Sequence, residues 1–162
     1  MKEKIYTLEN SFKLLGKDWA LITAKLGNRI NTMTASWGGF GHLWNKNIVY
    51  IYIRPQRYTY EFVDNSDYFT LSFFDEEHRQ KLLYLGKHSG RDGDKIKASG
   101  LTPLYEKDHA YFSEAKLVLV CKKIYKQKLD PKGFIDEKIE EFYKNDYHTM
   151  YIGEIVEIID RR

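Results

Sequence analysis

The feature that most constrains the fold is the run Ile48–Ile53, in which every side chain is apolar or aromatic. Continuous apolar runs of this length are typical of central strands covered on both faces. Arg54-Pro55 follows directly, and the proline ends the strand because it cannot donate a ladder hydrogen bond. No longer apolar run occurs, so no segment approaches the ~20 residues of a membrane-spanning helix. The run predicts a strand inside a β-rich protein with no membrane partner.

Composition agrees with a β-rich fold. Tyr, Phe and Trp make up 15% of the 162 residues, against three prolines, and aromatic residues favour strands. A chain of this length predicts one domain, residues 1–162, that folds without a disulfide or metal. The single cysteine, Cys121, excludes an internal disulfide and a Cys-x-x-Cys site. Because the N-terminus also lacks the apolar stretch of a signal peptide, we expect a cytoplasmic protein.

Net charge is a weak guide to partners. The value of +3 is too small to indicate nucleic acid by itself. Lys122, Lys123, Lys126 and Lys128, together with Tyr125, do form a basic and aromatic patch. Such a patch is either the solvated face of a strand or a nucleic-acid surface.

The order of the expected elements indicates the architecture. Gly27-Asn28 is expected to supply two positive-φ residues to a tight hairpin, and Gly38–Gly41 is too rich in glycine for regular structure. Most strands are joined by short links without regular strand–helix alternation, which favours a mainly β fold, a six-stranded antiparallel barrel with peripheral helices. The expected strands are Trp19–Lys25, Ile30–Trp37, Ile48–Ile53, Tyr68–Phe74, Ala115–Lys126 and His148–Ile159. The expected helices are Tyr58–Asn65, Glu76–Leu85 (with Asp75 as N-cap), Asp94–Ala98 and Asp136–Tyr143.

Several kinds of site are excluded by their missing patterns. The five histidines never occur as His-x-His or His-Glu-x-x-His, so we expect no metal site. Cys121 follows an apolar run and is expected to be a buried, inert thiol. Gly38–Gly41 falls one glycine short of a dinucleotide fingerprint, and Asp92-Gly93-Asp94 lacks the spacing of a calcium loop.

The stretch Asn31–Gly39 combines small residues, glycines and two large apolar side chains. A flat amphipathic ring such as isoalloxazine needs a slot of this kind, with small residues and backbone N–H groups near its heteroatoms. The same residues also suit an ordinary strand whose threonines face solvent and whose glycines form a loop.

The stretch His88–Lys95 combines a hydroxyl, flexible backbone amides, two cations and the start of a helix. These groups can hold a phosphate, and they also suit an N-capped surface loop. Arg54 and Arg57, on either side of Pro55, add cations that could meet the same anion.

Four segments occur in an order that resembles a known family, although no single one is diagnostic. They are Asn31–Gly38, Arg54–Tyr60, His88–Asp92 with Lys95, and His148 before Gly153–Val156. In this order they resemble the flavin reductase-like family, the relatives of flavoredoxin, from about Trp19 to Ile159. The resemblance implies an FMN-binding split barrel, a six-stranded antiparallel barrel with helices outside, and a homodimer with the flavin near the subunit interface.

The resemblance also implies roles for individual residues. His148 would lie near the flavin ring or the reductant, where its unperturbed pKa of ~6.5 allows either protonation state near neutrality; alternatively it is a strand-end histidine that only bonds backbone. Met33, Thr34, Ala35, Ser36 and Trp37 would run along the isoalloxazine and ribityl chain. The phosphate candidates are Arg54, Arg57, Thr59, Ser89, Gly90, Arg91 and Lys95.

The function expected from this resemblance is that of an NAD(P)H-dependent flavin reductase or related oxidoreductase. Hydride would pass from NADH or NADPH to flavin N5, and electrons would go on to a flavin, a protein or a small acceptor. The alternatives are an FMN-holding electron carrier without nicotinamide turnover and, from another class, a β-barrel that binds nucleic acid through Lys122–Lys128. One departure concerns His42–Asn47, which stand where many family members carry a proline pair; the mouth of the substrate site is expected to differ there.

Overall fold

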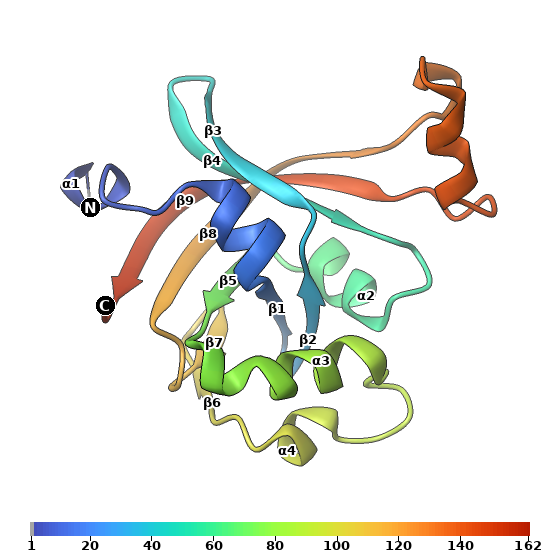
Figure 1. Ribbon diagram of the computed structural model, residues 1–162. Coiled ribbons are helices and arrows are strands. Elements are labelled where there is room, and N and C mark those ends of the chain that lie inside the picture. The colour runs from blue at the N-terminus through green and yellow to red at the C-terminus, as the bar shows by residue number, and fades with distance from the viewer. Residues whose placement is uncertain (1) are drawn as a thin grey trace.

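The computed structural model describes residues 2–162 and contains a seven-stranded antiparallel sheet with the spatial order β2-β1-β5-β8-β9-β4-β3 (Figure 1). A separate two-stranded sheet pairs β6 with β7. The strands are β1 (Ala20–Leu26), β2 (Arg29–Ala35), β3 (Gly38–Leu43), β4 (Lys46–Ile53), β5 (Tyr68–Phe73), β6 (Pro103–Tyr105), β7 (Ala110–Phe112), β8 (Leu117–Lys128) and β9 (Thr149–Asp160).

The helices are short and lie around the sheet (Figure 1). α2 occupies the range that the sequence predicts, whereas the helix expected from Asp136 to Tyr143 is a 3-10 helix, η4. No helix among residues 2–162 is both long enough and apolar enough to cross a bilayer. The helices are α1 (Lys2–Ile5), η1 (Phe12–Asp18), α2 (Tyr58–Asn65), η2 (Glu76–His78), α3 (Arg79–Lys87), α4 (Lys95–Ser99), η3 (Pro131–Gly133) and η4 (Glu137–Phe142).

The mainly β architecture with peripheral helices is confirmed, but the strand count differs. Gly38–Leu43, expected to be irregular, is the strand β3 and pairs with β4. Trp44 and Asn45 close this hairpin with φ values of 52° and 56°.

 The positive φ of both Trp44 and Asn45 is the conformation of a two-residue hairpin turn. Gly39 lies opposite Tyr50, and a Cβ on Gly39 would come within 2.2 Å of the Tyr50 hydroxyl, so the glycine lets the tyrosine ring cover an edge strand.

The first hairpin, β1–β2, also differs from its expected turn. Gly27 has a φ of +60°, whereas Asn28 is not among the positive-φ residues, so a single left-handed glycine turns the chain. Thr23 and Thr32 face each other across the two strands, and their buried hydroxyls are 2.9 Å apart in a hydrogen bond. The hydroxyls satisfy each other and allow two polar residues to lie inside the core.

The core fills the inner side of the curved sheet. Alternate residues of β4 (Val49, Ile51 and Ile53) are fully buried there, while the intervening Tyr50 and Tyr52 are only partly buried. The expectation that Ile48–Ile53 is covered on both faces is therefore wrong. Side chains from β1, β2, β5, β8, β9, α2 and η1 complete this core, and the β8 member Cys121 is buried as expected.

The outer face of the sheet is covered at one end. Val118 and Val120 of β8 point there and pack with Leu82 and Leu85 of α3 and with Phe112 of β7. The first half of β8, with its other side chains in the inner core, is thus the strand that is covered on both faces. Because α3 and α4 lie on this face, they also bring the loop between them next to β2 (Figure 1).

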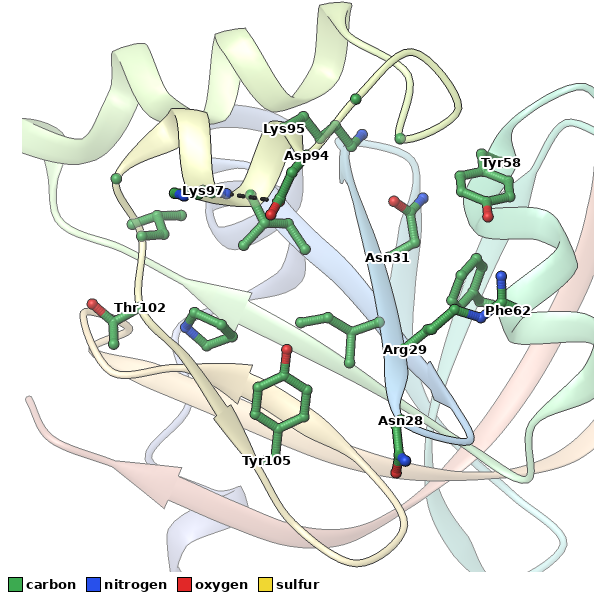
Figure 2. A pocket seen from close by; sticks show the side chains of 17 residues that line it. Asn28, Arg29, Asn31, Tyr58, Phe62, Asp94, Lys95, Lys97, Thr102 and Tyr105 are labelled. Carbon is green, nitrogen blue, oxygen red and sulfur yellow. Dashed lines mark hydrogen bonds between the residues drawn. The ribbon is translucent and has the colours of Figure 1, made fainter.

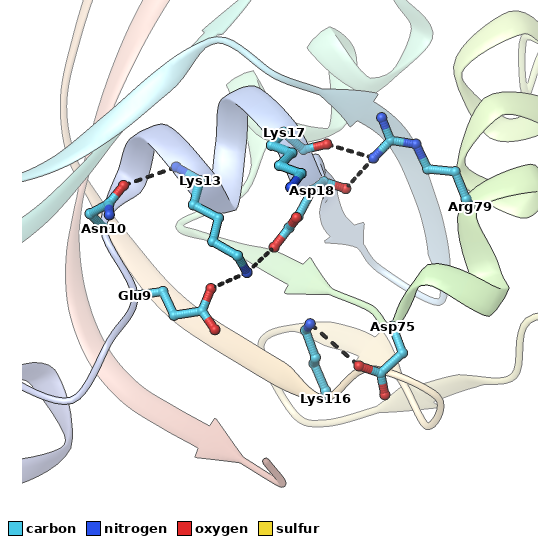
Figure 3. A network of polar contacts seen from close by, with 8 residues as sticks. All are labelled: Glu9, Asn10, Lys13, Lys17, Asp18, Asp75, Arg79 and Lys116. Carbon is cyan, nitrogen blue, oxygen red and sulfur yellow. Dashed lines mark hydrogen bonds and ion pairs between the residues drawn. The ribbon is translucent and has the colours of Figure 1, made fainter.

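The start of α3 differs from the expected capping. Asp75 makes no side-chain cap and instead forms an ion pair with Lys116 at 3.3 Å (Figure 3). The expected helix Glu76–Leu85 is accordingly divided into the 3-10 turn η2 and the helix α3.

Arg79, the first residue of α3, joins this helix to the N-terminal segment. Its guanidinium donates to the carbonyls of Lys17 at 2.6 Å and Asp18 at 3.0 Å (Figure 3) and lies 3.1 Å from the centre of the Trp19 ring. Lys13 adds an ion pair with Asp18 at 3.0 Å. These contacts hold Trp19 against α3, where its ring lines one of the cavities described below.

Candidate functional site

The C-terminal end of β2 forms one wall of a cavity of about 210 Å³, the β2 cavity. The opposite wall comes from the end of β4 and the start of β9. Neighbouring side chains in a strand point to opposite faces of the sheet. Because consecutive residues line this cavity, the cavity runs along the end of β2. Its lining residues are Met33, Thr34, Ala35, Ser36, Trp37, Tyr52, Arg54 and His148.

A second cavity, the loop cavity of about 190 Å³, lies between the start of α2 and the loop that follows α3. It brings together Arg57, Thr59, Ser89, Gly90 and Lys95, which the resemblance implied as phosphate candidates. No Asp or Glu side chain is among its lining residues. The others are Asn31, Gln56, Tyr58, Gly86, Lys87 and His88.

Lys95 and Arg57 lack a negative partner in the loop cavity. Lys95 is only 5% exposed, and its Nζ donates to the carbonyls of Leu85 and His88, each at 2.9 Å. Burial, together with the charge of Arg57, lowers the pKa of Lys95 to about 8. Burial and then the charge of Arg54 lower the pKa of Arg57. A bound anion would relieve both effects, so the loop cavity is suited to an anion.

Neutral groups complete the wall of the loop cavity. The buried Asn31 amide donates to the Thr59 hydroxyl at 2.8 Å, which leaves the Thr59 O–H available as a donor. A Cβ on Gly90 would lie 2.3 Å from Asn31 Oδ1 and 2.9 Å from the Tyr58 ring. Only glycine allows the loop to approach the Asn31 side chain this closely.

A third cavity, the bridging cavity of about 210 Å³, joins the other two. It shares Thr34, Ala35 and Ser36 with the β2 cavity, and Gly86 and Lys87 with the loop cavity. The three spaces therefore form one track from His148 to Lys95. The remaining lining residues of the bridging cavity are Trp19, Leu82 and Leu83.

Close packing of α3 against β2 shapes the bridging cavity. The Thr34 hydroxyl donates to the Leu82 carbonyl at 2.5 Å, and a Cβ on Gly86 would lie 3.2 Å from Thr34 Cβ. Thr34 is thus hydrogen-bonded to α3. The interpretation in which the threonines of this stretch face solvent is therefore wrong for Thr34.

His148 lies at the far end of the track and is 7% exposed. Its Nδ1 is 2.7 Å from the Tyr143 hydroxyl in a hydrogen bond, and its ring lies 5.2 Å from that of Trp37. Burial, with a further contribution from Arg54, lowers the pKa of His148 to about 4. The expectation of ready titration near neutrality is wrong, because the ring is neutral at pH 7. The alternative of a histidine that bonds only backbone is wrong as well.

Arg54 and Arg91 lie outside the loop cavity. Arg54 lines the β2 cavity, where it pairs with Asp146 at 2.5 Å and donates to the Phe142 carbonyl at 2.8 Å. Arg91 forms an ion pair with Glu61 and lies 4.8 Å from the centre of the Tyr58 ring. Both arginines therefore already have a carboxylate partner.

Sequence reasoning missed several lining residues. Tyr52 shares a strand face with Arg54, so two-residue alternation could have identified it. Gly86 and Lys87 directly precede the stretch His88–Lys95, so their position in the sequence could have identified them. Asn31 and Trp19 could not be identified, because their place depends on contacts with α2 and α3.

The basic patch on β8 has partners of its own. Lys123 Nζ donates to the carbonyls of Val63 and Asp64 at the end of α2, at 2.6 and 2.8 Å. Lys126 pairs with the Asp64 carboxylate at 2.9 Å. Cations at a helix C-terminus stabilise it. These contacts favour the structural interpretation of the patch over a nucleic-acid surface.

Comparison with solved structures supports the fold. The chain is similar to the flavoredoxin of Desulfovibrio vulgaris (Miyazaki F), with 25% identity, a TM-score of 0.69, and coverage of 88% of this chain and 68% of that one. It is also similar to an FMN-binding protein from Thermus thermophilus crystallised with 1-cyclohex-2-enone (19% identity, TM-score 0.69, 88% and 70% covered). A third is the NADH:FAD oxidoreductase SgcE6 of Streptomyces globisporus, in complex with NAD and FAD fragments (14% identity, TM-score 0.66, 88% and 74% covered).

Comparison with curated proteins by sequence found no match. The model of the flavin reductase like domain, however, matches residues 13–161, nearly the whole chain. The split-barrel fold, the track of cavities and this match agree, and the chain belongs to the flavin reductase-like family.

Proposed function

We propose that this protein binds FMN and acts in the cytoplasm as an NAD(P)H-dependent flavin reductase or related oxidoreductase. The observation that carries the proposal is the loop cavity at one end of a track lined by small residues. There the buried Lys95 and the partly buried Arg57 meet no lining carboxylate. The protein's single cysteine, Cys121, is free and buried, which agrees with a reducing compartment.

The residues present fit FMN along the whole track. A phosphate monoester carries close to two negative charges at pH 7, which suits the two neighbouring cations Arg57 and Lys95. The hydroxyls of Thr59 and Ser89 can add hydrogen bonds. The small side chains Ala35 and Ser36 leave room for a flat ring, since they line both the β2 and the bridging cavity.

Bound FMN would supply the redox chemistry, taking a hydride at N5 from a reduced nicotinamide and releasing electrons to an acceptor. The protein's own groups orient and shield that chemistry. Trp37 packs edge-on against Phe142 at 5.9 Å and covers one side of the β2 cavity. When the Tyr143 hydroxyl donates to His148 Nδ1, Nε2 carries the proton and can donate to a ring oxygen or a nicotinamide carboxamide.

The family supports this proposal at the level of flavin chemistry. The similar structures include an FMN-binding protein and an oxidoreductase whose complex contains NAD and FAD fragments. For this chain, both FMN as resident cofactor and NADH or NADPH as reductant are part of the proposal.

A homodimer is also part of the proposal. Trp37 is 46% exposed although it lines the β2 cavity, and Phe142 beside it is exposed too. A twofold partner would cover such apolar groups, and twofold dimers are the commonest closed assemblies. Light scattering should give about twice the chain mass of 19.3 kDa; a monomer that holds FMN would contradict the dimer.

The central test is the absorbance spectrum of the protein reconstituted with FMN under anaerobic conditions. We expect a yellow complex that bleaches when NADH or NADPH is added. A stable yellow complex that neither nucleotide bleaches would contradict the reductase and indicate an electron carrier. Failure to retain FMN would contradict the proposal as a whole.

A further inference from the structure

The largest cavity, about 680 Å³, is a groove beyond the loop cavity that the FMN track does not include (Figure 2). We name it the edge groove, because the start of β2, the terminal strand of the main sheet, runs along it. α2 lies on one side of this strand, and α4 with the chain that leads into β6 lies on the other (Figure 2). The groove is thus a channel between two helices with a strand edge inside it.

The backbone of β2 presents unpaired groups to the edge groove. Leu26 and Arg29 close a two-residue turn, so they form a hydrogen-bonded pair, and the next pair, Lys25 and Ile30, does not exchange hydrogen bonds. The N–H and C=O of Ile30 therefore point away from β1. Within residues 2–162, no group outside the β1–β2 pair bonds to either of them. A strand edge of this kind can pair with one further strand.

The two faces of the sheet offer different side chains at this edge. Arg29 extends on the α2 side, where its guanidinium lies 5.6 Å from the centre of the Phe62 ring (Figure 2). Ile30 extends on the opposite side and packs with the cluster that contains Ile96 and Leu101. Neighbouring residues of a strand alternate in this way. A strand added at this edge would meet a cation on one face and apolar side chains on the other.

The charge of the edge groove is positive. Arg29, Lys95 and Lys97 line it, and none of the three takes part in an ion pair within residues 2–162. Asp94 is the one acidic residue among the described residues that line the groove, and its carboxylate accepts a hydrogen bond from the Lys97 backbone N–H at 3.0 Å. The groove is therefore complementary to an acidic occupant.

We propose that the edge groove binds an extended acidic segment of a partner protein, which adds a strand to the main sheet beside β2. Alternate side chains of the segment are acidic toward Arg29 and apolar toward Ile96 and Leu101. Backbone hydrogen bonds to Ile30 supply affinity, and the alternating side chains supply selectivity. This inference goes beyond the proposed function and does not depend on a bound flavin.

Fluorescence anisotropy of a labelled peptide tests the inference. The probe is a short fluorescein-labelled peptide in which glutamate and valine alternate, and the protein is titrated into it with and without FMN. The controls are a lysine–valine peptide and two N-methylated forms of the probe, one methylated at every glutamate and one at every valine. Neighbouring amides of a strand point to opposite edges, so only one of the two methylated sets faces β2.

We expect the glutamate peptide to bind about tenfold more tightly than the lysine peptide, because the groove is cationic. One N-methylated form should lose about tenfold in affinity, since methylation removes the donors that face β2. The other form should change by less than about threefold, because its methyl groups point away from the sheet.

Variants of the groove give a matched test on the protein. Ile30→Pro removes the N–H that points into the groove and no bond to β1, and it should weaken peptide binding by about tenfold. Ile30→Ala keeps that N–H and should change the affinity by less than about threefold. Arg29→Ala should weaken binding by about three- to fivefold. Lys132→Ala, in the exposed segment after β8, should leave the affinity unchanged.

Thermal unfolding compares the stability of Ile30→Pro and Ile30→Ala. If the proline variant is too unstable to titrate, the two N-methylated peptides decide the question on wild type.

The inference is overturned if the glutamate peptide does not bind, or if it binds no better than the lysine peptide. Equal affinities for the two N-methylated forms also overturn it, because binding would then not use the edge of β2. Peptide binding that appears only when the protein is diluted to monomers overturns it as well and assigns the groove to an interface between copies of this chain. A protein that binds the peptide as expected but holds no FMN supports the inference while the proposed function fails.

Discussion

The cations at the two ends of the track differ in whether a carboxylate neutralises them. At the β2 cavity, Arg54 is neutralised by Asp146 at 2.5 Å. Hydrogen bonds from the Lys144 backbone, then from Arg54 and Gln56, hold the pKa of Asp146 well below its usual range. At the loop cavity, Arg57 and Lys95 have lowered pKa values and no lining carboxylate. The cation at the first end is thus paired within the protein, whereas the cations at the second end are suited to a bound anion. The contrast explains how a single track can orient a ligand that is charged at only one end.

The largest expected effect tests the unpaired end. Arg57→Ala should weaken FMN binding by roughly ten- to a hundredfold, because it removes a charge-assisted contact worth about 1.5–3 kcal/mol. Riboflavin, which lacks the phosphate, should bind with nearly unchanged affinity. Fluorescence titration measures both.

Arg91→Ala is the matched comparison. Arg91 is paired with Glu61 and does not line the loop cavity, so its loss should change FMN affinity by less than about threefold. Equal losses in the two variants, or equal losses of FMN and riboflavin in Arg57→Ala, would contradict the contrast between paired and unpaired cations.

The next effect concerns the shape of the unpaired end. Gly90→Ala places a Cβ 2.3 Å from Asn31 Oδ1, so the loop must move away from the phosphate site. We expect a loss of about 1–2 kcal/mol in the free energy of unfolding and weaker FMN binding. Urea denaturation measures the first. Gly133→Ala is the control, since nothing lies within 4 Å of a Cβ at that position.

The paired end is tested by kinetics. His148→Ala should bind FMN normally yet be reduced by NADH or NADPH about tenfold more slowly, equivalent to ~1.4 kcal/mol of lost transition-state stabilisation. His148→Asn keeps a donor and should recover most of the rate. Tyr143→Phe should slow reduction to a smaller extent, because it removes the hydrogen bond to Nδ1. Stopped-flow rates identical to wild type in all three variants would leave His148 with a structural role.

The smallest effect is a pH dependence at the unpaired end. The pKa of free Lys95 is lowered to about 8, and a phosphate prefers the protonated amine. FMN affinity should therefore be nearly level around pH 7 and fall as the pH rises through 8, by about fivefold between pH 8 and 9. Riboflavin affinity should stay level across the same interval. An FMN affinity that stays level as well would show that Lys95 does not contact the phosphate.

The features that were predicted well from the sequence depend on residues close together in the chain. The helix Tyr58–Asn65 has the expected bounds, and Asp94 caps α4 through the Lys97 backbone N–H as its position implied. Both depend on residues a few positions apart. The strand β3 was missed for the complementary reason: its glycines are explained only by Tyr50, which lies on the neighbouring strand.

The candidate site divides in the same way. The stretches Met33–Trp37 and Ser89–Lys95 could be recognised in the sequence, because small residues, glycines and cations occur together there. The sequence did not show which cations have a carboxylate partner and which do not. Arg54 meets Asp146 from 92 positions away, and Arg91 meets Glu61 from 30 positions away.

The sequence by itself determined the positions of most strands, the absence of a motif for metal or nucleophilic chemistry, and the resemblance that led to a flavin. Only the tertiary structure decided that His148 is neutral, that Lys95 is buried beside Arg57, and that a groove continues past the loop cavity along β2. The physical reason is how far apart in the chain the interacting residues lie. Strand and helix preferences arise from neighbouring residues, whereas burial and the pairing of charges depend on segments that meet only when the sheet closes around its core.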